Sequence, residues 1–374
     1  MSAFAGRLQL GGWRWVFLLL MTGGCLASFL AARYGLGATT RLSDAIPWGL
    51  CLGLNVFCGV ALAAGALSLA SVASVIGGPE WRNVGRACLL TGCLGYLVAM
   101  LGMVANGPID NYWRALLQGW TQRSILSGAA WTVLLLALLL FIEFLPQYSL
   151  RLARARWFTI LQRLDLPLLI LATILAVLHQ FGLNRLITLA KPRFSPLWSS
   201  PSLSLMFYLS SLAMAFAVLL FASWRSRLAF GKALPSSVLP AIARALTVAV
   251  FVYLVIRLMD LMERHLLFSM FSVSREGLLL LLEIVLLLVG MMWIKGNEEE
   301  PRELYFGAVL IIAGVVANRL NTAITALEAG AGQDYLPRWG EFLISSSLVA
   351  AGVAGFALGV KHLSVFSEVE PWNS

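Results

Sequence analysis

Hydrogen-bonding side chains gather near the end of one apolar segment, AVLHQFGLNRLITL. It holds four candidates for chemistry within two helical turns: His179, Gln180, Asn184 and Arg185. Imidazole and amide groups donate hydrogen bonds to carbonyl oxygens, and imidazole also exchanges protons near neutral pH. A His-Gln pair at the end of a helix can equally serve as a helix cap or contact a lipid headgroup.

Ionisable residues inside apolar segments form a second set of candidates: Glu143, Asp165, Arg257, Asp260, Glu283, Arg319 and Glu341. A charged side chain in the middle of a bilayer costs about 2.5–3.5 kcal/mol on insertion scales, so each one needs a partner or a function. Glu143 and Asp165 lie near segment ends, where headgroups can solvate them. Glu283, in LLLLLEIVLLLV, has no polar neighbour in sequence, and Arg257 and Asp260 share one helix face. The set predicts a buried ion network or a proton path.

The composition places these residues in a membrane protein. The chain has 374 residues, of which 60% are hydrophobic and 12% charged, whereas soluble domains carry about 25% charged residues. The mean hydropathy is +0.84, and the long apolar runs lack the alternation of a β-barrel. We therefore predict an all-α polytopic membrane protein. The net charge of +9 is attributed to arginines that face headgroups and cytoplasm rather than to nucleic-acid binding.

Ten membrane spans are predicted, at 13–32, 46–76, 84–106, 124–146, 165–189, 201–223, 238–262, 275–295, 304–325 and 339–362. The first is interpreted as an uncleaved helix rather than a signal peptide. No hydrophilic stretch is long enough for a soluble domain, so residues 1–374 are predicted to form a single integral membrane domain. GLCLG at 49–53 and GFALG at 355–359 carry small residues four positions apart, which lets helices pack closely in lipid.

An even number of spans puts both termini on one side of the membrane. The loops on that side contain RLARAR at 151–156 and WRSRLAFGK at 224–232, together with Arg82 and Arg86. Because lysine and arginine favour the cytoplasmic side, both termini are predicted to be cytoplasmic in a bacterial inner membrane. Most polar motifs fall in the opposite loops, so the site is predicted to face a periplasm.

Cysteine and histidine usage argues against a resident metal or haem. The five cysteines all fall inside predicted helices, and no CxxC occurs. A membrane b-type haem usually needs two axial histidines, and no such pair is predicted among His179, His265 and His362. We predict no metal and no haem in this chain. A redox role then requires a ligand that carries electrons in lipid, and a quinone, with two carbonyls that need donors, fits a pocket of His, Gln, Asn and Trp.

Several motifs together resemble the NrfD/PsrC family of quinone-interacting membrane subunits. They are IPWGLCLGLNVFCG (46–59), IEFLP (142–146), LHQFGL with PLW (178–183 and 196–198), IRLMDL (256–261), the lone Glu283, NRLN (318–321) and YLPRWGEFLISSS (335–347). Within the family, the chain is most similar to the ten-helix branch of HybB-, QrcD- and HmcC-like subunits, which includes the membrane subunit of nickel–iron hydrogenase-2.

The resemblance implies two four-helix bundles between two peripheral helices. Their expected boundaries are 13–32 for the first peripheral helix, 46–189 and 201–325 for the bundles, and 339–362 for the last helix. It also implies a menaquinone site near the periplasmic face of the first bundle. The side chains expected around this site are Trp48, Asn55, His179, Gln180 and Asn184.

The resemblance further implies partners and a reaction. A periplasmic ferredoxin-like subunit with 4Fe–4S clusters would dock on Lys191, Arg193 and Trp198, fed by catalytic or multihaem cytochrome c subunits. Electrons would pass to menaquinone, as in the Qrc complex, and the chain alone would hold no complete active site for donor oxidation. Proton movement would use the ionisable set named above. Hydrogenase-2-type members carry acids where this chain has Asn55, Asn106 and Gly128, which favours a Qrc- or Hmc-like complex over a hydrogenase.

Two other functions remain open on the sequence. A secondary transporter could use ten helices and Glu283, although transporters usually break helices around a mid-membrane substrate site. A purely structural anchor would bind no quinone. Substitution of His179 or Asn55 would then leave the activity of the assembled complex unchanged.

Overall fold

The computed structural model describes residues 2–42, 46, 48–105, 131–132, 135–140, 142, 156–189, 194–363 and 365–368. Within these residues, nine helical segments are long and apolar enough to cross a membrane. They match nine of the ten predicted spans and confirm the all-α polytopic fold. The remaining predicted span, 124–146, lies largely outside the described residues.

Where the structure describes it, the first half of the chain forms α-helices and a π-helical segment. They are α1 (Ser2–Tyr34), α2 (Leu36–Thr39), the π segment η1 (Leu52–Phe57), α3 (Cys58–Ile76), α4 (Pro79–Ala105) and α7 (Arg156–Leu189). η1 continues directly into α3, so the two form one span.

The second half contains a second π segment in the same kind of position. Its helices are α8 (Leu203–Phe230), α9 (Leu239–Glu263), α10 (Arg275–Gly296), α11 (Pro301–Leu320), α12 (Ala326–Ala331) and α13 (Trp339–His362). The π segment η6 (Asn321–Thr325) joins α11 to α12. Two 3-10 turns, η4 (Ser236–Val238) and η5 (Leu267–Phe271), and two short strands, β1 (Lys232–Ala233) and β2 (Ser367–Glu368), complete the described elements.

Local sequence signals set several of the helix ends. Gly77 and Gly78 have φ values of 74° and 87°, a region that favours glycine, and they separate α3 from α4. The hydroxyl of Ser274 accepts a hydrogen bond of 3.1 Å from the backbone of Gly277 and caps α10. Pro301 stands at the first position of α11, where its missing N–H leaves no bond unmade.

The helices of the second half form a four-helix bundle. α8 packs against α9 and α11, and α10 packs against the same two helices. In the first half, α3 packs against α4 and α7, and it also packs against α8, which joins the two halves. At this junction the backbones meet closely, because a Cβ on Gly65 would lie 2.0 Å from the carbonyl oxygen of Ser211.

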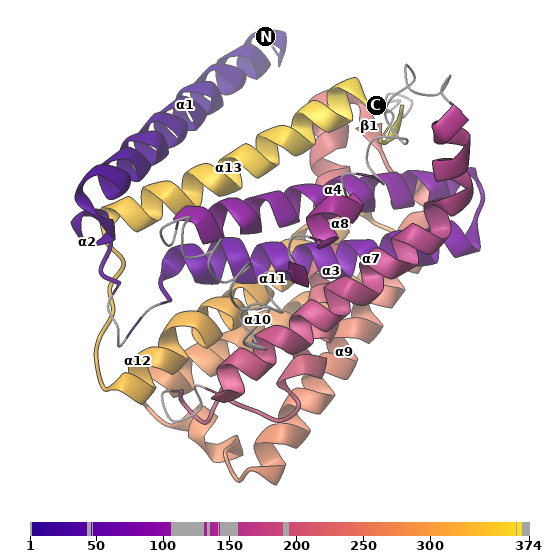
Figure 1. Ribbon diagram of the computed structural model, residues 1–374. Coiled ribbons are helices and arrows are strands. Elements are labelled where there is room, and N and C mark those ends of the chain that lie inside the picture. The colour runs from indigo at the N-terminus through magenta and orange to yellow at the C-terminus, as the bar shows by residue number, and fades with distance from the viewer. Residues whose placement is uncertain are drawn as a thin grey trace.

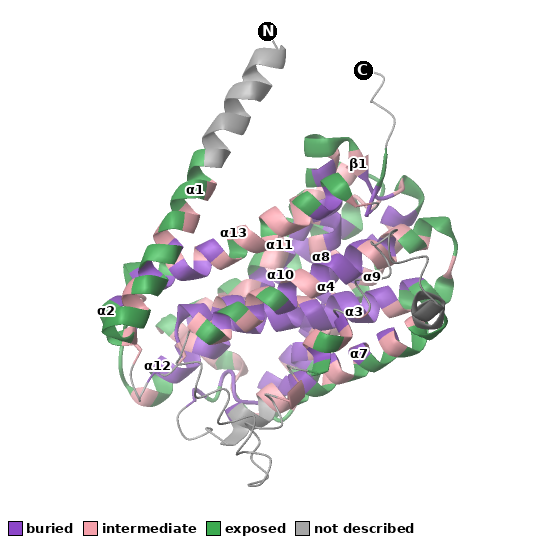
Figure 2. Cartoon of the chain, turned by 45° about the horizontal axis from the view of Figure 1, so that its top comes forward, coloured by how far each residue is buried: buried purple, intermediate pink, exposed green. Residues whose placement is uncertain are grey.

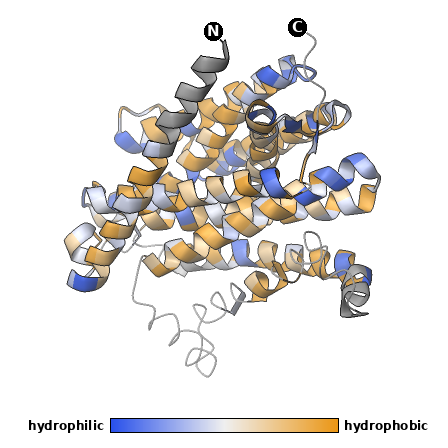
Figure 3. Cartoon of the chain, turned by 90° about the horizontal axis from the view of Figure 1, so that it is seen from above, coloured by the Kyte–Doolittle hydropathy of each residue, from blue (hydrophilic) through white to orange (hydrophobic). Residues whose placement is uncertain are grey.

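The helices α1 and α13 lie side by side at the edge of the molecule (Figure 1). Gly23 and Gly24 of α1 face Leu343 and Ser347 of α13. Only 11% of the most apolar window of α1 is buried, against 83% for the span that contains α3, and Figure 2 shows the same contrast. The helices carry mostly apolar residues along their lengths (Figure 3), as a lipid-facing surface requires.

The start of α1 and the end of α13 lie at the same end of the molecule (Figure 1). β2 follows α13 and pairs in antiparallel fashion with β1, which lies between α8 and α9. We call this end, with β1, β2 and the starts of α4 and α11, the terminal face. The opposite end, with η1, η5 and α12, is the distal face.

Candidate functional site

His179 and Gln180 of α7 are buried inside the first half of the molecule. The Nδ1 atom of His179 lies 3.1 Å from the hydroxyl of Thr132, and its ring packs edge-on against the ring of Tyr96 at a centroid distance of 6.4 Å. A hydrogen bond of 2.9 Å between Thr173 and Ser71 fixes α7 on α3 less than two turns earlier. The structure therefore directs His179 inward, toward α4, and buries Gln180.

Two buried polar atoms beside His179 have no hydrogen-bond partner in the described part of the chain. They are the phenol oxygen of Tyr96 and the amide nitrogen of Gln180. An unsatisfied buried polar group costs about 1–3 kcal/mol, so a native protein normally supplies a partner. A polar ligand atom at this point would provide one.

An apolar cavity of about 270 Å³ is lined in part by Tyr96. Its lining residues are Leu90, Cys93, Leu94, Tyr96, Leu97, Met100, Ala137 and Leu140. Leu97 is 50% exposed on the outside of the molecule, so the cavity borders a lipid-facing surface. Tyr96 was not predicted from the sequence, because one tyrosine in an apolar helix carries no pattern.

Asn55 and Trp48 lie nearer the distal face than His179. Asn55, in η1, is buried, and a Cβ on Gly102 would lie 2.7 Å from its Cβ atom. Tyr96, the partner of His179, precedes Gly102 by six residues on α4, or about 9 Å along the helix. The structure thus places Asn55 and His179 in the same half of the molecule at different depths, without direct contact.

The polar environment of Asn55 is also incomplete. Its amide nitrogen lies 3.4 Å from the sulfur of Cys51, and its oxygen has no partner among the described residues. The ring of Trp48 packs against Phe57 at 5.7 Å and against Phe194 at 5.4 Å. Trp48 is therefore an aromatic packing residue close to the junction of the two halves.

Several predicted site residues lie outside the residues that the structure describes. Glu143, Lys191 and Arg193 belong to this group, as do Asn106 and Gly128. Asn184 lies on α7, but its side chain is also outside the described part.

Trp198 is corrected from a surface residue to a buried one. Its side chain is 0% exposed, and its indole nitrogen lies 3.4 Å from an oxygen of Glu283. It therefore anchors the segment before α8 to α10 and cannot offer a docking surface to a partner. A loop position and an aromatic ring suggested exposure, but the indole N–H instead serves a buried carboxyl group.

Glu283 is the centre of a fully buried polar network in the second bundle. One carboxyl oxygen accepts hydrogen bonds from Tyr253 at 3.0 Å and Asn318 at 2.9 Å, and the other from Asn321 at 3.4 Å. The Nε atom of Arg257 lies 4.0 Å from the first oxygen. This confirms that Glu283 has partners on other helices, and it adds Tyr253 and Asn318 to the predicted set.

The remaining predicted ionisable residues divide among separate contacts. Arg319 donates to the carbonyl of Phe207 at 2.9 Å and to Ser210 at 2.8 Å, and its guanidinium lies 4.0 Å from the centre of the Phe207 ring. Asp260 accepts hydrogen bonds from Ser200 and Arg264 nearer the distal face. Arg319 is thus attached to α8 and Asp260 to the segment that precedes it.

Glu341 forms a different cluster at the distal face. Its carboxyl group accepts hydrogen bonds from the backbone of Arg41 at 3.0 Å and of Leu50 at 3.3 Å, and from the hydroxyl of Tyr335. Burial and the adjacent Glu341 raise the pKa of Tyr335 above its usual value of 10.0. Glu341 therefore fixes the segment before α3 to the start of α13, and the structure does not bring it to Glu283.

Glu328 is a further buried acid that sequence reasoning did not select. Its Oε1 atom lies 3.2 Å from Arg275 and accepts a hydrogen bond of 2.7 Å from the backbone of Tyr335. Its position in a loop-like stretch, ALEAGAGQDYLP, gave no indication of burial. It links α12 to α10 and to the same distal cluster.

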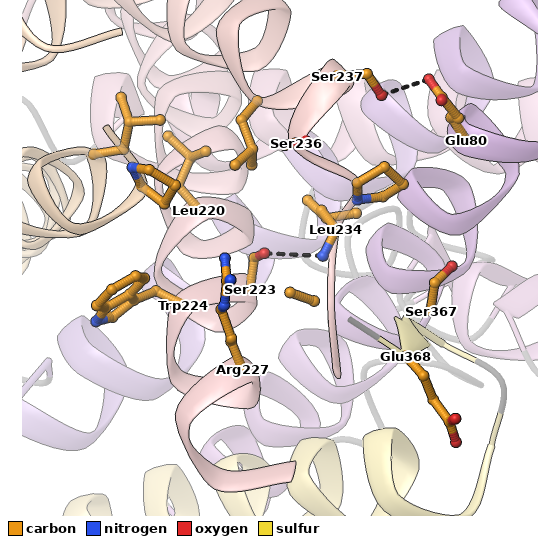
Figure 4. Close-up of a pocket in the computed structure, with 15 residues that line it drawn as sticks. Glu80, Leu220, Ser223, Trp224, Arg227, Leu234, Ser236, Ser237, Ser367 and Glu368 are labelled. Atoms are coloured by element: carbon orange, nitrogen blue, oxygen red, sulfur yellow. Dashed lines mark hydrogen bonds between the residues drawn. The ribbon is translucent and has the colours of Figure 1, made fainter. Parts of the chain in front are cut away.

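A larger cavity, of about 470 Å³, opens at the terminal face (Figure 4). Ser237 donates a hydrogen bond of 2.7 Å to Glu80 across it, and the hydroxyl of Ser223 accepts one of 3.0 Å from the backbone of Leu234. Trp224 and Arg227 of α8 also line it. It lies at the end of the molecule opposite the predicted quinone residues, so it is separate from the candidate site.

Comparison with known proteins gives this arrangement a family. Residues 38–328 match the family model described as polysulphide reductase, NrfD. The chain belongs to the NrfD family. Together with the nine membrane-crossing helices among the described residues, this membership makes it a multi-pass membrane subunit of a respiratory oxidoreductase.

Two relatives match the chain over most of its length. It is 25% identical over 363 residues to a protein of Nitratidesulfovibrio vulgaris, and the alignment covers 94% of this chain and 93% of that protein. It is 24% identical over 344 residues to the probable Ni/Fe-hydrogenase 2 b-type cytochrome subunit of Escherichia coli, with coverage of 89% and 86%.

The name of the Escherichia coli relative includes a b-type cytochrome, and a haem of this kind usually needs two axial histidines. His265 follows α9 at the distal face, and His362 ends α13 at the terminal face. His179 is buried on α7, bonded to Thr132, and no ring contact joins any two of the three histidines. The described residues do not fit a haem held by two axial histidines.

Proposed function

We propose that this chain is the subunit through which a respiratory complex passes electrons from a periplasmic iron–sulfur subunit to menaquinone. The observation that supports it is the apolar cavity lined in part by Tyr96, whose phenol is unpartnered, together with the unpartnered amide nitrogen of the buried Gln180 on the neighbouring helix α7. An isoprenoid chain suits the apolar lining. A quinone carbonyl suits the two groups, because both can donate a hydrogen bond.

In this proposal the chain binds and orients the quinone and supplies protons. Reduction adds two electrons and two protons to the quinone, and the electrons arrive from the partner subunit. Tyr96 and Gln180 would hold one carbonyl, and His179, whose Nδ1 atom is held by Thr132, would exchange protons beside it. Asn55 packs against α4 at a point about 9 Å along the helix from Tyr96. It would therefore support a second polar position rather than the same carbonyl.

The surroundings of the complex are part of the same proposal. The periplasmic side would be the distal face, and Lys191 and Arg193 would contribute to docking of a ferredoxin-like subunit. Both termini would then be cytoplasmic, in a bacterial inner membrane. Menaquinone reduction in a Qrc-like complex is favoured over a hydrogenase, as the replacement of three acids by Asn55, Asn106 and Gly128 suggests.

A secondary transporter is less well supported. In the described part of the chain, the spans continue through η1 and η6 without a break. Both carboxyl oxygens of Glu283 already receive hydrogen bonds from side chains of this chain. A transported ion would have to displace these donors.

The test is binding of menaquinone to the purified protein with Tyr96→Phe. This change removes only the unpartnered hydroxyl, so folding should persist while the quinone loses about one hydrogen bond, or about 1 kcal/mol. We expect the affinity to fall about fivefold, as measured by titration of a menaquinone analogue. Tyr305→Phe is the matched control, because Tyr305 stacks on Phe221 of α8, away from the cavity. Equal affinities in both variants, or no quinone binding at all, would reject the proposed site.

A further inference from the structure

Two π-helical segments of the described chain, η1 and η6, pack against each other where its two halves meet. A Cβ on Gly53 would lie 3.0 Å from the Cβ atom of Ala323 and 3.2 Å from a side-chain carbon of Leu320. Residues this small allow two helix backbones to approach closely. π segments are rare and often accompany functional sites, so direct contact between two of them calls for a physical explanation.

Each π segment carries one buried asparagine that reaches into a different polar site. Asn55 of η1 lies in the first half, with its oxygen unpartnered. Asn321 of η6 donates to Glu283 at 3.4 Å and to the carbonyl of Leu279 at 3.3 Å, and its oxygen accepts from Thr325. Both of these buried amides therefore project from π segments.

We propose that Gly53 is a positioning residue for Glu283. A π turn holds one residue more than an α turn, so return of η6 to α geometry would rotate the flanking residues by about 100° and move Asn321 away from the carboxyl group. Gly53 lets η1 seat on Ala323 and holds η6 in its π form. The conformation of the Asn55 segment and the environment of Glu283 are thereby coupled across the junction.

The experiment compares the infrared spectra of the full-length purified chain with and without Gly53→Ala. The carboxyl band of Glu283 is identified by its absence from the spectrum of Glu283→Gln. The added methyl would meet Ala323 at 3.0 Å, so we expect the Glu283 band to shift as Asn321 moves. Gly92→Ala is the matched control, because its added Cβ would sit 3.6 Å from Ala66, an ordinary contact within the same half.

Rescue separates positioning from general destabilisation. Ala323→Gly in the Gly53→Ala background restores the space, so the band should return to its original position. A folded Gly53→Ala chain with an unchanged Glu283 band would overturn the proposal, and so would a shifted band that Ala323→Gly fails to restore. If Gly53→Ala does not fold, Ala323→Gly alone loosens the same contact and should shift the band, while an unchanged band rejects the coupling.

This inference rests on the proposed function only for its effect on turnover. The infrared band reports on Glu283 in the protein without quinone or partner. A band shift in a chain that binds no menaquinone would keep the coupling and reject the quinone site. An unshifted band in a chain that binds menaquinone would reject the coupling and keep the quinone site.

Discussion

The carboxyl group of Glu283 has no exposed surface and receives hydrogen bonds from α9, α11 and η6 and from Trp198. Glu283→Ala leaves the donors of Tyr253 and Asn318 and the charge of Arg257 without this partner. Removal of one member of a buried ion pair costs about 3–5 kcal/mol, so we expect a large fall in the thermal unfolding midpoint in detergent. Glu263→Ala, at the exposed end of α9, is the control, and equal midpoints in the two variants would contradict the structural role.

Tyr335 gives a second prediction at the scale of single residues, this time in alkaline solution. Its folded pKa lies above the unfolded value of 10.0, because burial and Glu341 both oppose ionisation. Its contribution to stability is therefore complete below pH 10 and is lost as the pH rises above 10, where the unfolded chain releases the proton more readily. Between pH 9 and 11, the unfolding midpoint of the natural chain should fall more steeply than that of Tyr335→Phe. Parallel slopes would mean that Tyr335 is not buried against Glu341.

Single residues also show where sequence reasoning reaches its limit. The isolation of Glu283 in an apolar run predicted a partner, because an unpaired carboxylate is too costly in lipid. The identities of Tyr253 and Asn318 as partners could not be predicted, because they depend on which helices are neighbours. Trp198 was predicted to lie on the surface because it belongs to a loop. A loop residue can nevertheless turn inward when a buried acceptor lies within reach.

At the scale of helices, the contact between α3 and α8 should be intolerant of added volume. A Cβ on Gly65 would collide with the carbonyl oxygen of Ser211, which is backbone and cannot rotate away. Overpacking of this kind costs about 1–3 kcal/mol, so Gly65→Ala should lower the unfolding midpoint. Gly92→Ala meets ordinary contacts and should change it little. Similar midpoints would show that the two helices are free to separate.

Helix positions were largely predictable, whereas helix irregularities were not. Nine of the ten predicted apolar runs match the nine spans found among the described residues, and α13 begins and ends at the predicted residues 339 and 362. Nothing in NVF or NTAIT marks a π turn, because the extra residue is stabilised by neighbours that are distant in sequence. The contact between Gly53 and Ala323 illustrates this: GLCLG predicted close packing but not its partner.

For the whole molecule, the orientation in the membrane can be tested with two cysteine variants. Phe268→Cys lies at an 82% exposed position of η5 on the distal face, and Glu299→Cys lies between α10 and α11 on the terminal face. A membrane-impermeant maleimide should label Phe268→Cys from the periplasm and Glu299→Cys only after lysis. The unsubstituted chain, whose five cysteines all lie in helices or their ends, is the background control. The opposite labelling pattern would invert the proposed topology.

The pairing of α1 with α13 has a consequence for biogenesis. The two helices come from opposite ends of the sequence, yet Gly24 of α1 fits against Ser347 of α13. During translation, α1 leaves the ribosome before α13, and the spans between them are made in the interval. α1 must therefore remain without this partner until α13 has been synthesised. The pairing of α1 with α13 can thus form only after the intervening spans have been made.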